Sequence, residues 1–539
     1  MKIFPRVRPN LRTFFVTSGL IISGIILFAL LKIYGQFLVF WIFGKPKCDK
    51  CNIIVIEADV LGSNHLPCYG YYRNTAPNLC TFAKENVFFS HSYSQGPQTT
   101  SSTFSLFTSL YPVNHGINIP YEKSILNDKY LTLTQALKAQ GYNTIYVGPS
   151  IPQVPLDRGI ERGFDDIIIT PSNISDNPDI MTWWKKGLQK VVENTQNGKK
   201  TFLFIYTDYL HDPYLVGNKK LLYASNRYSN FAITDKELNT LTPEILNYYL
   251  TSVSERINGG TKEGYTSGDL NLYKQLKEAK NFDQAKKIFF SYPTIERNHA
   301  LLYFNYYLRI NPKDNNVVKY LAALYDEKIN MFDKDMGSFF KYLGENDLKR
   351  KSIFILTSAH AEEFMEHGDW GHKNKLFNTN LTIPFIMSIP TISNRHINDL
   401  IQNIDLYPTL LGLIGVEKPS YLQGIDLSDL IYGLPDAKKE NYVISQIPYA
   451  DPPLASISDG QWKLIVNTKI NKAISLFNLV TDAKEQKNVA DNNPEITDRL
   501  LQELDKIMNN KNTKPIKKFN FPDWINDEER RKIIKEGYF

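Results

Sequence analysis

The residue types best suited to metal or acid–base chemistry gather in one segment, TSAHAEEFMEHGDWGH, at residues 357–372. It directly follows the apolar run SIFIL at residues 352–356. Imidazole nitrogens and carboxylate oxygens are the ligands that proteins offer to divalent ions. An acidic, histidine-rich turn at the end of a buried strand therefore predicts a metal site.

Two other segments carry polar residues that suit the same chemistry. Asp59 follows the apolar run NIIVI at residues 52–56, and the hydroxyl-rich stretch QTTSSTFSLFTSLYP occupies residues 98–112. A threonine or serine hydroxyl has a pKa close to that of water, about 15.7, so it attacks an ester only after activation by a bound cation or a base. A hydroxyl nucleophile in such a stretch would therefore need a metal ion or a base beside it.

The elements that must position these residues alternate between apolar strands and amphipathic helices. Apolar runs occupy residues 52–56, 142–147, 201–207, 352–356 and 383–387, and a helix is predicted at residues 132–140, ended by Gly141. Strands that are apolar on both faces and separated by helices indicate a mostly parallel sheet in an α/β sandwich. Ligands of such sheets bind beyond the carboxyl ends of the strands.

The remaining chain divides into an insertion, a C-terminal part and a tail. Residues 215–315 are predicted to be a helical insertion, followed by a long amphipathic helix at residues 316–343. We expect the α/β domain to span residues 50–418 and a small α+β subdomain to span residues 419–510. Short alternating runs such as 462–466 and 474–479 predict an antiparallel sheet there, and residues 511–539 read as a charged tail.

The N-terminal 45 residues have the pattern of a membrane anchor. Residues 13–31 contain no charge, and as a helix they would extend about 28 Å, the thickness of a bilayer core. Basic residues precede this stretch, which favours a cytoplasmic N-terminus under the positive-inside rule. The prediction is a single-pass membrane protein with its main domain on the periplasmic or extracellular side; a buried helix of a soluble domain is the alternative.

Charge and cysteine content narrow the partners and the compartment. The chain has 539 residues, a formal net charge of +6 and no dense run of lysine and arginine, which argues against nucleic acid as a partner. All four cysteines lie between Cys48 and Cys80. They predict one or two disulfides in an exported domain, with the pairing left open, or a structural zinc site.

Seven segments in one order resemble the sulfatase family of the alkaline phosphatase superfamily. The resemblance rests on NIIVIEADVLGSNHLPCYGY, TAPNLCTFAKENVFFSHSYSQ, FTSLYPVNHGI, HDPY, EEFMEHGDWGH, DLYPTLLGLIGV and the pair WKLIVNT and ISLFNLVTD. It covers about residues 52–214 and 316–490 and implies an alkaline-phosphatase-type α/β sandwich. Asp59 takes the place of the first metal-binding acid. Val60 stands where sulfatases carry a second acid, whereas the phospho-transferase branch holds its metal with one acid there.

The resemblance places the nucleophile at Thr99. Sulfatases carry C-x-P-S-R in this segment, and counting back from Tyr111 and Pro112 puts Thr99 at the cysteine position and Thr103 at the arginine position. Threonine cannot become formylglycine, so the pattern fits the phospho-transferase branch better. A hydroxyl-rich N-cap of a helix from Ser102 onward explains the same stretch, and both interpretations can hold.

The resemblance also implies one divalent ion, Mn²⁺, Zn²⁺, Ca²⁺ or Mg²⁺, held by Asp59, Thr99 and His360. Ala359 replaces the expected aspartate of an Asp-His pair, which predicts weak metal binding. Neither Glu362 nor Glu363 is expected to take over that position without a rearrangement of the turn. Three residues are predicted to bind the anionic group of the substrate: His211, His372 and Lys373.

Two functions remain open on this pattern. The first is a membrane-anchored sulfatase-like hydrolase or transferase that acts on phosphate or sulfate esters, with phosphate favoured, through a metal-activated Thr99. Its substrate would be an anionic ester, carried by a lipid or a glycan. The second is a catalytically degenerate domain that binds an anionic lipid, a glycan or a protein partner, which Ala359 and the missing arginine favour.

Overall fold

The computed structural model describes residues 47–509 with internal gaps, the longer of which are 172–179, 225–239, 259–266, 292–300 and 302–312. The predicted membrane anchor at residues 13–31, Lys373 and the predicted tail lie outside the described residues. Among the helices that are described, none is both long and apolar enough to cross a membrane.

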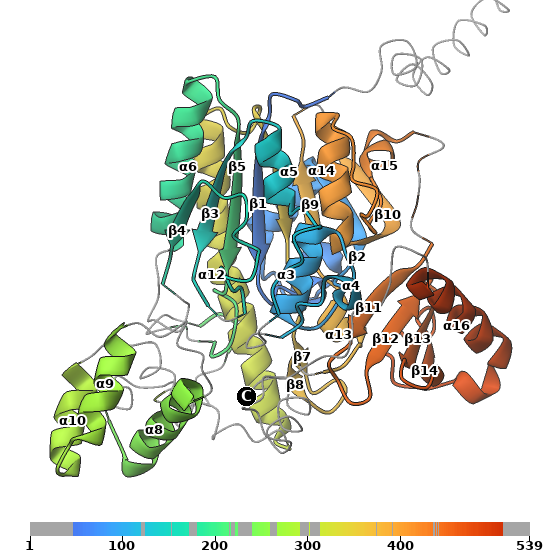
Figure 1. Ribbon diagram of the computed structural model, residues 1–539. Helices are drawn as coiled ribbons and strands as arrows, with labels where there is room; N and C mark the ends of the chain where they lie inside the picture. Colours follow the sequence, from blue (N-terminus) through green and yellow to red (C-terminus); the bar gives the residue numbers. More distant parts are fainter. Residues whose placement is uncertain are drawn as a thin grey trace, which may run out of the picture.

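The core of the molecule is an eight-stranded sheet with the order β10-β2-β9-β6-β1-β5-β3-β4 (Figure 1). The strands in this order are β10 (Arg395–Gln402), β2 (Val87–Tyr93), β9 (Phe385–Ser388), β6 (Ser352–Thr357), β1 (Asn52–Ala58), β5 (Thr201–Thr207), β3 (Asn143–Gly148) and β4 (Asp166–Ile169). The central strands β1, β5 and β6 are buried along their whole length, as their continuous apolar runs predict.

The sheet is mostly parallel, as predicted, with one reversed strand. β1 pairs in parallel with both β5 and β6, whereas β9 runs antiparallel to β2 and to β6. The apolar run at residues 383–387 therefore yields a strand of the opposite direction, which its hydrophobicity alone does not reveal. The carboxyl ends of β1, β5 and β6 still meet at one edge, because these three strands are parallel.

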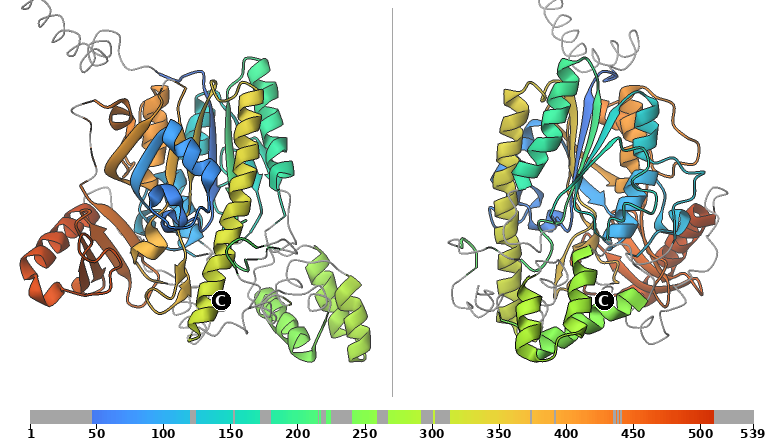
Figure 2. Two further views of the ribbon diagram at one scale, coloured as in Figure 1. Left: turned by 180° about the vertical axis from the view of Figure 1, so that it is seen from behind. Right: turned by 60° about the vertical axis from the view of Figure 1, so that its left-hand side comes forward.

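Helices cover both faces of the sheet. On the face toward the viewer in Figure 1 lie α3 (Thr99–Thr108), α5 (Leu133–Ala139) and α14 (Leu406–Ile414). The other face, seen in the left view of Figure 2, carries α6 (Ile180–Gln196) and α12 (Asn315–Glu345). α5 begins with a capping box formed by Thr132 and Gln135, which fixes the helix start that the sequence predicts at Thr132.

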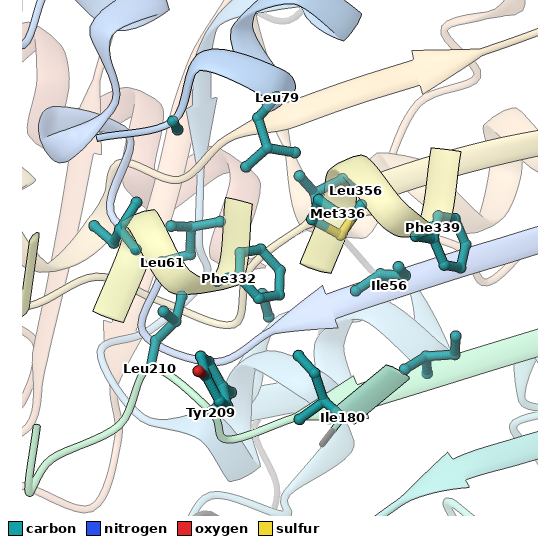
Figure 3. Packing of buried hydrophobic residues seen from close by; sticks show 14 of the residues in the cluster. Ile56, Leu61, Leu79, Ile180, Tyr209, Leu210, Phe332, Met336, Phe339 and Leu356 are labelled. Carbon is teal, nitrogen blue, oxygen red and sulfur yellow. The ribbon is translucent and has the colours of Figure 1, made fainter. Parts of the chain in front are cut away.

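α12 anchors its face of the sheet through one apolar stripe. Phe332, Met336 and Phe339 are fully buried and lie against Ile56 of β1 and Leu356 of β6 (Figure 3). Residues at helical spacing share one face of a helix, so this stripe is the consequence of the sequence pattern. The helix thereby supports the two strands whose ends carry the candidate site.

Two smaller units flank the sandwich. The C-terminal part forms an antiparallel sheet in the order β11-β12-β13-β14, with strands Val443–Ile447, Leu454–Ser458, Trp462–Asn467 and Lys472–Asn478. Helix α16 (Pro494–Asn509) packs on this sheet. Within the predicted insertion the described helices are α8 (Pro243–Asn258), α9 (Ser267–Lys277) and α10 (Phe282–Ser291), which share a separate apolar cluster.

Short elements complete the described structure around the sheet. They are α2 (Pro77–Glu85), α4 (Pro112–His115), α13 (Asn378–Leu381), α15 (Ser428–Tyr432), β7 (Glu363–Phe364) and β8 (Trp370–Gly371). The four cysteines form two disulfides, Cys48–Cys51 and Cys68–Cys80. This pairing uses the thiols that a structural zinc site would need.

Candidate functional site

The candidate site lies at the carboxyl edge of the sheet. Asp59 directly follows β1, the turn at residues 358–362 follows β6, and His211 lies shortly after β5. Thr99 is the first residue of α3, with Gln98 as the N-cap. The helix therefore begins earlier than the predicted start at Ser102. Orphan backbone N–H groups and the positive end of the helix dipole at this point favour a bound anion.

Asp59, Thr99 and His360 come together as the sequence pattern expects. The Oγ1 of Thr99 lies 3.1 Å and 3.2 Å from the two carboxylate oxygens of Asp59 and 3.1 Å from Nε2 of His360. His360 Nε2 is also 3.5 Å from Asp59 Oδ1. The side chains of all three are almost completely buried. A hydroxyl is thus held between a carboxylate and an imidazole at the N-terminus of a helix.

A strained turn and a tyrosine fix Asp59. Val60 has a positive φ of 56°, which is rare for a β-branched residue and costs about 1–3 kcal/mol. The turn is held because the Tyr325 hydroxyl bonds the Val60 carbonyl and accepts from Gly62 N at 3.0 Å. On the other side the buried Tyr206 hydroxyl donates to Asp59 Oδ2 at 2.7 Å. Asp59 is therefore positioned before any ligand arrives.

The tautomer of His360 follows from its hydrogen bonds. Its Nδ1 lies 3.1 Å from the carbonyl oxygen of Ala361, which can only accept, so Nδ1 carries the proton. Burial, with a smaller effect of the neighbouring His372, lowers the pKa of His360 to about 4. The ring is neutral at pH 7, and the lone pair on Nε2 faces Thr99 and Asp59.

Ala359 lies buried next to this trio and contributes no ligand atom from its side chain. It is fully buried, and its carbonyl oxygen accepts a 2.5 Å hydrogen bond from the Ser94 hydroxyl. Ser94 Oγ also contacts Ser102 Oγ at 2.7 Å. The backbone of the turn is thus tied to β2 and α3, although the expected carboxylate is missing.

His372 is paired with a glutamate. Its Nδ1 hydrogen-bonds Oε1 of Glu362, and the Tyr214 hydroxyl donates to Oε2 of the same carboxylate at 2.9 Å. The His372 ring lies 4.3 Å from the His360 ring and 5.2 Å from the His211 ring, measured between centroids. Burial raises the pKa of Glu362 to about 8.

The two glutamates of the turn have different surroundings. Glu362 belongs to the histidine cluster, whereas the Oε1 of Glu363 accepts from the backbone nitrogens of His367 and Asp369 at 2.7 Å and 3.3 Å. The sequence predicts that neither glutamate takes over the position lost at Ala359 without a rearrangement of the turn. In the structure Glu362 is hydrogen-bonded to His372 and Tyr214. Distance along the turn does not reveal the β7–β8 hairpin, which brings His372 back to Glu362.

Two buried residues beside the site, Tyr206 and Glu57, were not predicted from the sequence. Tyr206 is one aromatic residue within an apolar strand, and only the register of β1 with β5 brings it beside Asp59. Glu57, in β1, is fully buried; it accepts from Thr103 Oγ1 at 3.0 Å, and burial raises its pKa to about 8. A glutamate inside an apolar strand is a signal for Glu57 that could have been noticed.

The residues present fit a divalent ion. Donor atoms that share one ion at about 2.1 Å lie roughly 3 to 3.5 Å apart. The separations among Asp59 Oδ1, Thr99 Oγ1 and His360 Nε2 are 3.1, 3.1 and 3.5 Å. The geometry is therefore that of three donors on one side of a coordination shell. Glu362 and His372 form a second group of donors with His360.

Residues 51–416, more than half of the chain, match the sulfatase family. The chain belongs to the sulfatase family. Residues 365–513 match the family described as N-sulphoglucosamine sulphohydrolase, C-terminal, and they include the antiparallel sheet and α16. The fold expectation drawn from the seven motifs is thereby confirmed.

Sulfatases of known name and structure are similar to this chain over different lengths. It is 25% identical to an ulvan-active sulfatase of Formosa agariphila over 86% of this chain and 81% of the relative. It is 28% identical to arylsulfatase K of Mus musculus over 40% of this chain, which spans only 41% of that relative. A solved structure in complex with its substrate D-glucosamine-2-N,6-O-disulfate shares the fold, with a TM-score of 0.59 at 18% identity over 87% of this chain and 100% of that chain.

This member of the sulfatase family departs from the family pattern at definite places in the site. Val60 and Ala359 stand where the motifs imply metal-binding acids, and Thr99 and Thr103 stand where they imply the cysteine and the arginine. The departures remove anionic oxygen donors and leave imidazole nitrogens in place.

Proposed function

We propose that this protein is a hydrolase of anionic esters, foremost sulfate esters on a carbohydrate, with Thr99 as the attacking group. The observation that carries the proposal is the position of Thr99 Oγ1, within 3.1–3.2 Å of the Asp59 carboxylate and of His360 Nε2 at the N-terminus of α3. The family and the names of its relatives support sulfate and carbohydrate. In the sequence, Thr99 at the cysteine position favours a phosphate ester instead. A phosphate ester is therefore the comparison substrate in the test below.

In the first half of the reaction Thr99 Oγ1 attacks the sulfur atom. A bond forms between this oxygen and sulfur while the bond from sulfur to the ester oxygen breaks, and the hydroxyl proton passes to Asp59, its hydrogen-bond acceptor. The leaving alkoxide takes the proton held by the Glu362–His372 pair. Donors at the helix N-terminus and the nearby His211 favour the charge on the sulfuryl oxygens.

In the second half water hydrolyses the sulfate ester of Thr99. Its oxygen bonds to sulfur, its proton returns to the Glu362–His372 pair, and the proton on Asp59 returns to the threonine oxygen as sulfate leaves. A divalent ion held by Asp59, Thr99 and His360 would lower the pKa of the hydroxyl and offset the charge of the ester. The protein residues supply the orientation, because the trio and its tyrosine brace are fixed by hydrogen bonds.

We also propose where the catalytic domain is located. Both disulfides suit an oxidising compartment, which supports a domain on the periplasmic or extracellular side, anchored through residues 13–31. Protease added to intact cells or spheroplasts is then expected to digest the domain. Protection until lysis would contradict this orientation.

The decisive experiment traps the threonine adduct. Wild-type protein and Thr99→Ala are incubated with 4-nitrophenyl sulfate, 4-nitrophenyl phosphate and a sulfated disaccharide, and the rates and the mass of the α3 peptide are measured. We expect Thr99→Ala to lower the rate by at least about 10³-fold, in line with the loss of a nucleophile. Thr100→Ala is the matched control, because its hydroxyl instead donates to Gln153 O at 2.9 Å; its rate stays within about threefold of wild type. Equal losses in both variants would refute Thr99 as the nucleophile.

A second candidate function is a binding domain without turnover. The side chains of Ala359 and Thr103 favour it, because they supply neither the carboxylate nor the guanidinium that the motifs imply. In that case the sulfated disaccharide binds in calorimetry, His211→Ala weakens it, and no substrate is consumed by wild type. Consumption that disappears in Thr99→Ala excludes this alternative.

A further inference from the structure

A two-stranded hairpin builds a second group of donors beside the trio. β7 and β8 pair antiparallel with Glu363 opposite Gly371 and Phe364 opposite Trp370. The next positions across this ladder are Glu362 and His372, and facing residues of an antiparallel pair lie close enough for their side chains to interact. The hairpin therefore delivers His372 to Glu362, and both to His360.

The group has the composition of a metal site that prefers transition ions. One ligand atom from each of His360, Glu362 and His372 lies within 4.8 Å of the other two, and all three residues are buried. Two imidazole nitrogens and one carboxylate are a common zinc ligand set. Ca²⁺ and Mg²⁺ prefer sites made of oxygen atoms, and this turn has lost the oxygen donor of its expected Asp-His pair.

The surroundings hold these donors in place. Tyr214 donates to the second oxygen of Glu362. The Asn380 side chain donates to Gly371 O at 3.0 Å, and Ala361 N donates to Asn380 O at 2.9 Å. One asparagine thus ties the turn after β6 to the end of the hairpin. Partners behind metal ligands of this kind orient the ligands and strengthen their binding.

We propose that Glu362 and His372 replace the missing carboxylate of position 359, so that the ion at His360 is bound by two nitrogens and one carboxylate and is Zn²⁺ in preference to Ca²⁺ or Mg²⁺. The hydrogen bond between Glu362 and His372 is then exchanged for bonds to the ion. Only one lone pair is available on His360 Nε2, so the site takes one ion there. With the ion bound, Glu362 and His372 are ligands and hold no transferable proton. The leaving alkoxide of the proposed reaction then takes its proton from water, and the attacking water restores it in the second half. The selectivity for Zn²⁺ rests on the ligand set and does not depend on turnover.

Calorimetry on the metal-free full chain tests the selectivity. Zn²⁺, Ca²⁺ and Mg²⁺ are titrated separately into wild type, Glu362→Gln, His372→Gln and the control Glu363→Gln. We expect Zn²⁺ to bind at least about 100-fold more tightly than Ca²⁺ or Mg²⁺. Both Glu362→Gln and His372→Gln weaken Zn²⁺ binding by at least about 10- to 100-fold. The control is matched, because Glu363 is the adjacent buried glutamate but belongs to the loop at His367 and Asp369.

Cobalt gives a second measurement that is independent of activity. Co²⁺ bound by histidine nitrogen in a site of low coordination number absorbs visible light strongly, and Zn²⁺ displaces it. We expect this absorption in wild type and in Glu363→Gln, and its loss in His372→Gln. Metal-free unfolding curves show whether each variant is folded. If Glu362→Gln does not fold, His372→Gln alone tests the proposal.

The outcomes separate this inference from the proposed function. Zn²⁺ binding that needs Glu362 and His372, in a protein without turnover, leaves the inference standing and refutes only the hydrolase. Equal affinity for Ca²⁺ and Zn²⁺ overturns the inference. Equal losses in Glu362→Gln and Glu363→Gln overturn it too, because an effect shared by both glutamates is structural.

Discussion

The two halves of the candidate site are built differently. The rigid half, formed by Asp59, Thr99 and Tyr206, carries oxygen atoms that are joined by one hydrogen-bond network. The loop half follows β6 and is formed by His360, Glu362 and His372. It carries imidazole nitrogens and a carboxylate on a turn and on a hairpin whose strands have two residues each. Val60 and Ala359 stand where the family motifs have acids, and one of them lies in each half. The comparison shows that each half has lost an expected acid, whereas only the loop half supplies further donors in exchange, those of Glu362 and His372.

The largest expected effect concerns the buried acid beneath the rigid half. Glu57 has its pKa raised to about 8, and one of its oxygens has no hydrogen-bond partner among the described residues. A folded-state pKa above the unfolded value of 4.5 means that its contribution to stability is present below pH 4.5 and is lost as the pH rises toward 8. The free energy of unfolding of Glu57→Gln is therefore expected to exceed that of wild type by an amount that grows from pH 5 to pH 8. The difference reaches a few kcal/mol and at most about 5.

Urea unfolding of metal-free protein at several pH values measures this difference. The advantage of Glu57→Gln must level off above pH 8, since Glu57 is then ionised in both states of the wild type. A constant difference across the whole range would contradict the prediction, because it would mean that the pKa of Glu57 is the same in the folded and the unfolded state.

Ala359→Asp adds a carboxylate, and so an oxygen donor, to the loop half. The new carboxylate lies beside His360, and we expect a gain of ~10–100-fold in affinity for Mn²⁺, Ca²⁺ or Mg²⁺, by analogy with losses on removal of ligand-shell groups. Without metal the variant is less stable, because a charge is added at a fully buried position near Asp59. Calorimetry with each ion and metal-free unfolding give both quantities.

Ala361→Asp is the matched control for that substitution. Ala361 is equally buried, but its side chain packs toward Gly62, so the same change is expected to destabilise the protein without a gain in affinity. If the two variants behave alike, the loop half does not place residue 359 at the ion, and the comparison between the halves fails.

The smallest effect belongs to the brace of Asp59. Tyr206→Phe removes the 2.7 Å hydrogen bond to Asp59 Oδ2, and we expect metal affinity to fall by about tenfold, the lower end for groups behind a ligand. Tyr146→Phe is the control, since Tyr146 is equally buried but donates to Pro149 O at 3.0 Å. Calorimetry that finds the same affinity in both variants would show that the orientation of Asp59 does not depend on Tyr206.

The sequence by itself determined the elements and the family. Apolar runs predict β1, β5 and β6 nearly to the residue, since a strand buried on both faces must be apolar throughout. Thr99 could be placed by counting from Tyr111 and Pro112, because both belong to one continuous segment. Asp59 and His360 could be placed at strand ends, and parallel strands bring their ends together.

Only the tertiary structure decided which side chains face one another. Tyr206 meets Asp59 through the β1–β5 register, and Glu362 meets His372 through the β7–β8 register. The reversed direction of β9 and the pairing of the four cysteines were likewise open. Hydrophobic periodicity reports which face of an element is buried, but register and strand order depend on contacts between residues far apart in the chain, which no local pattern encodes.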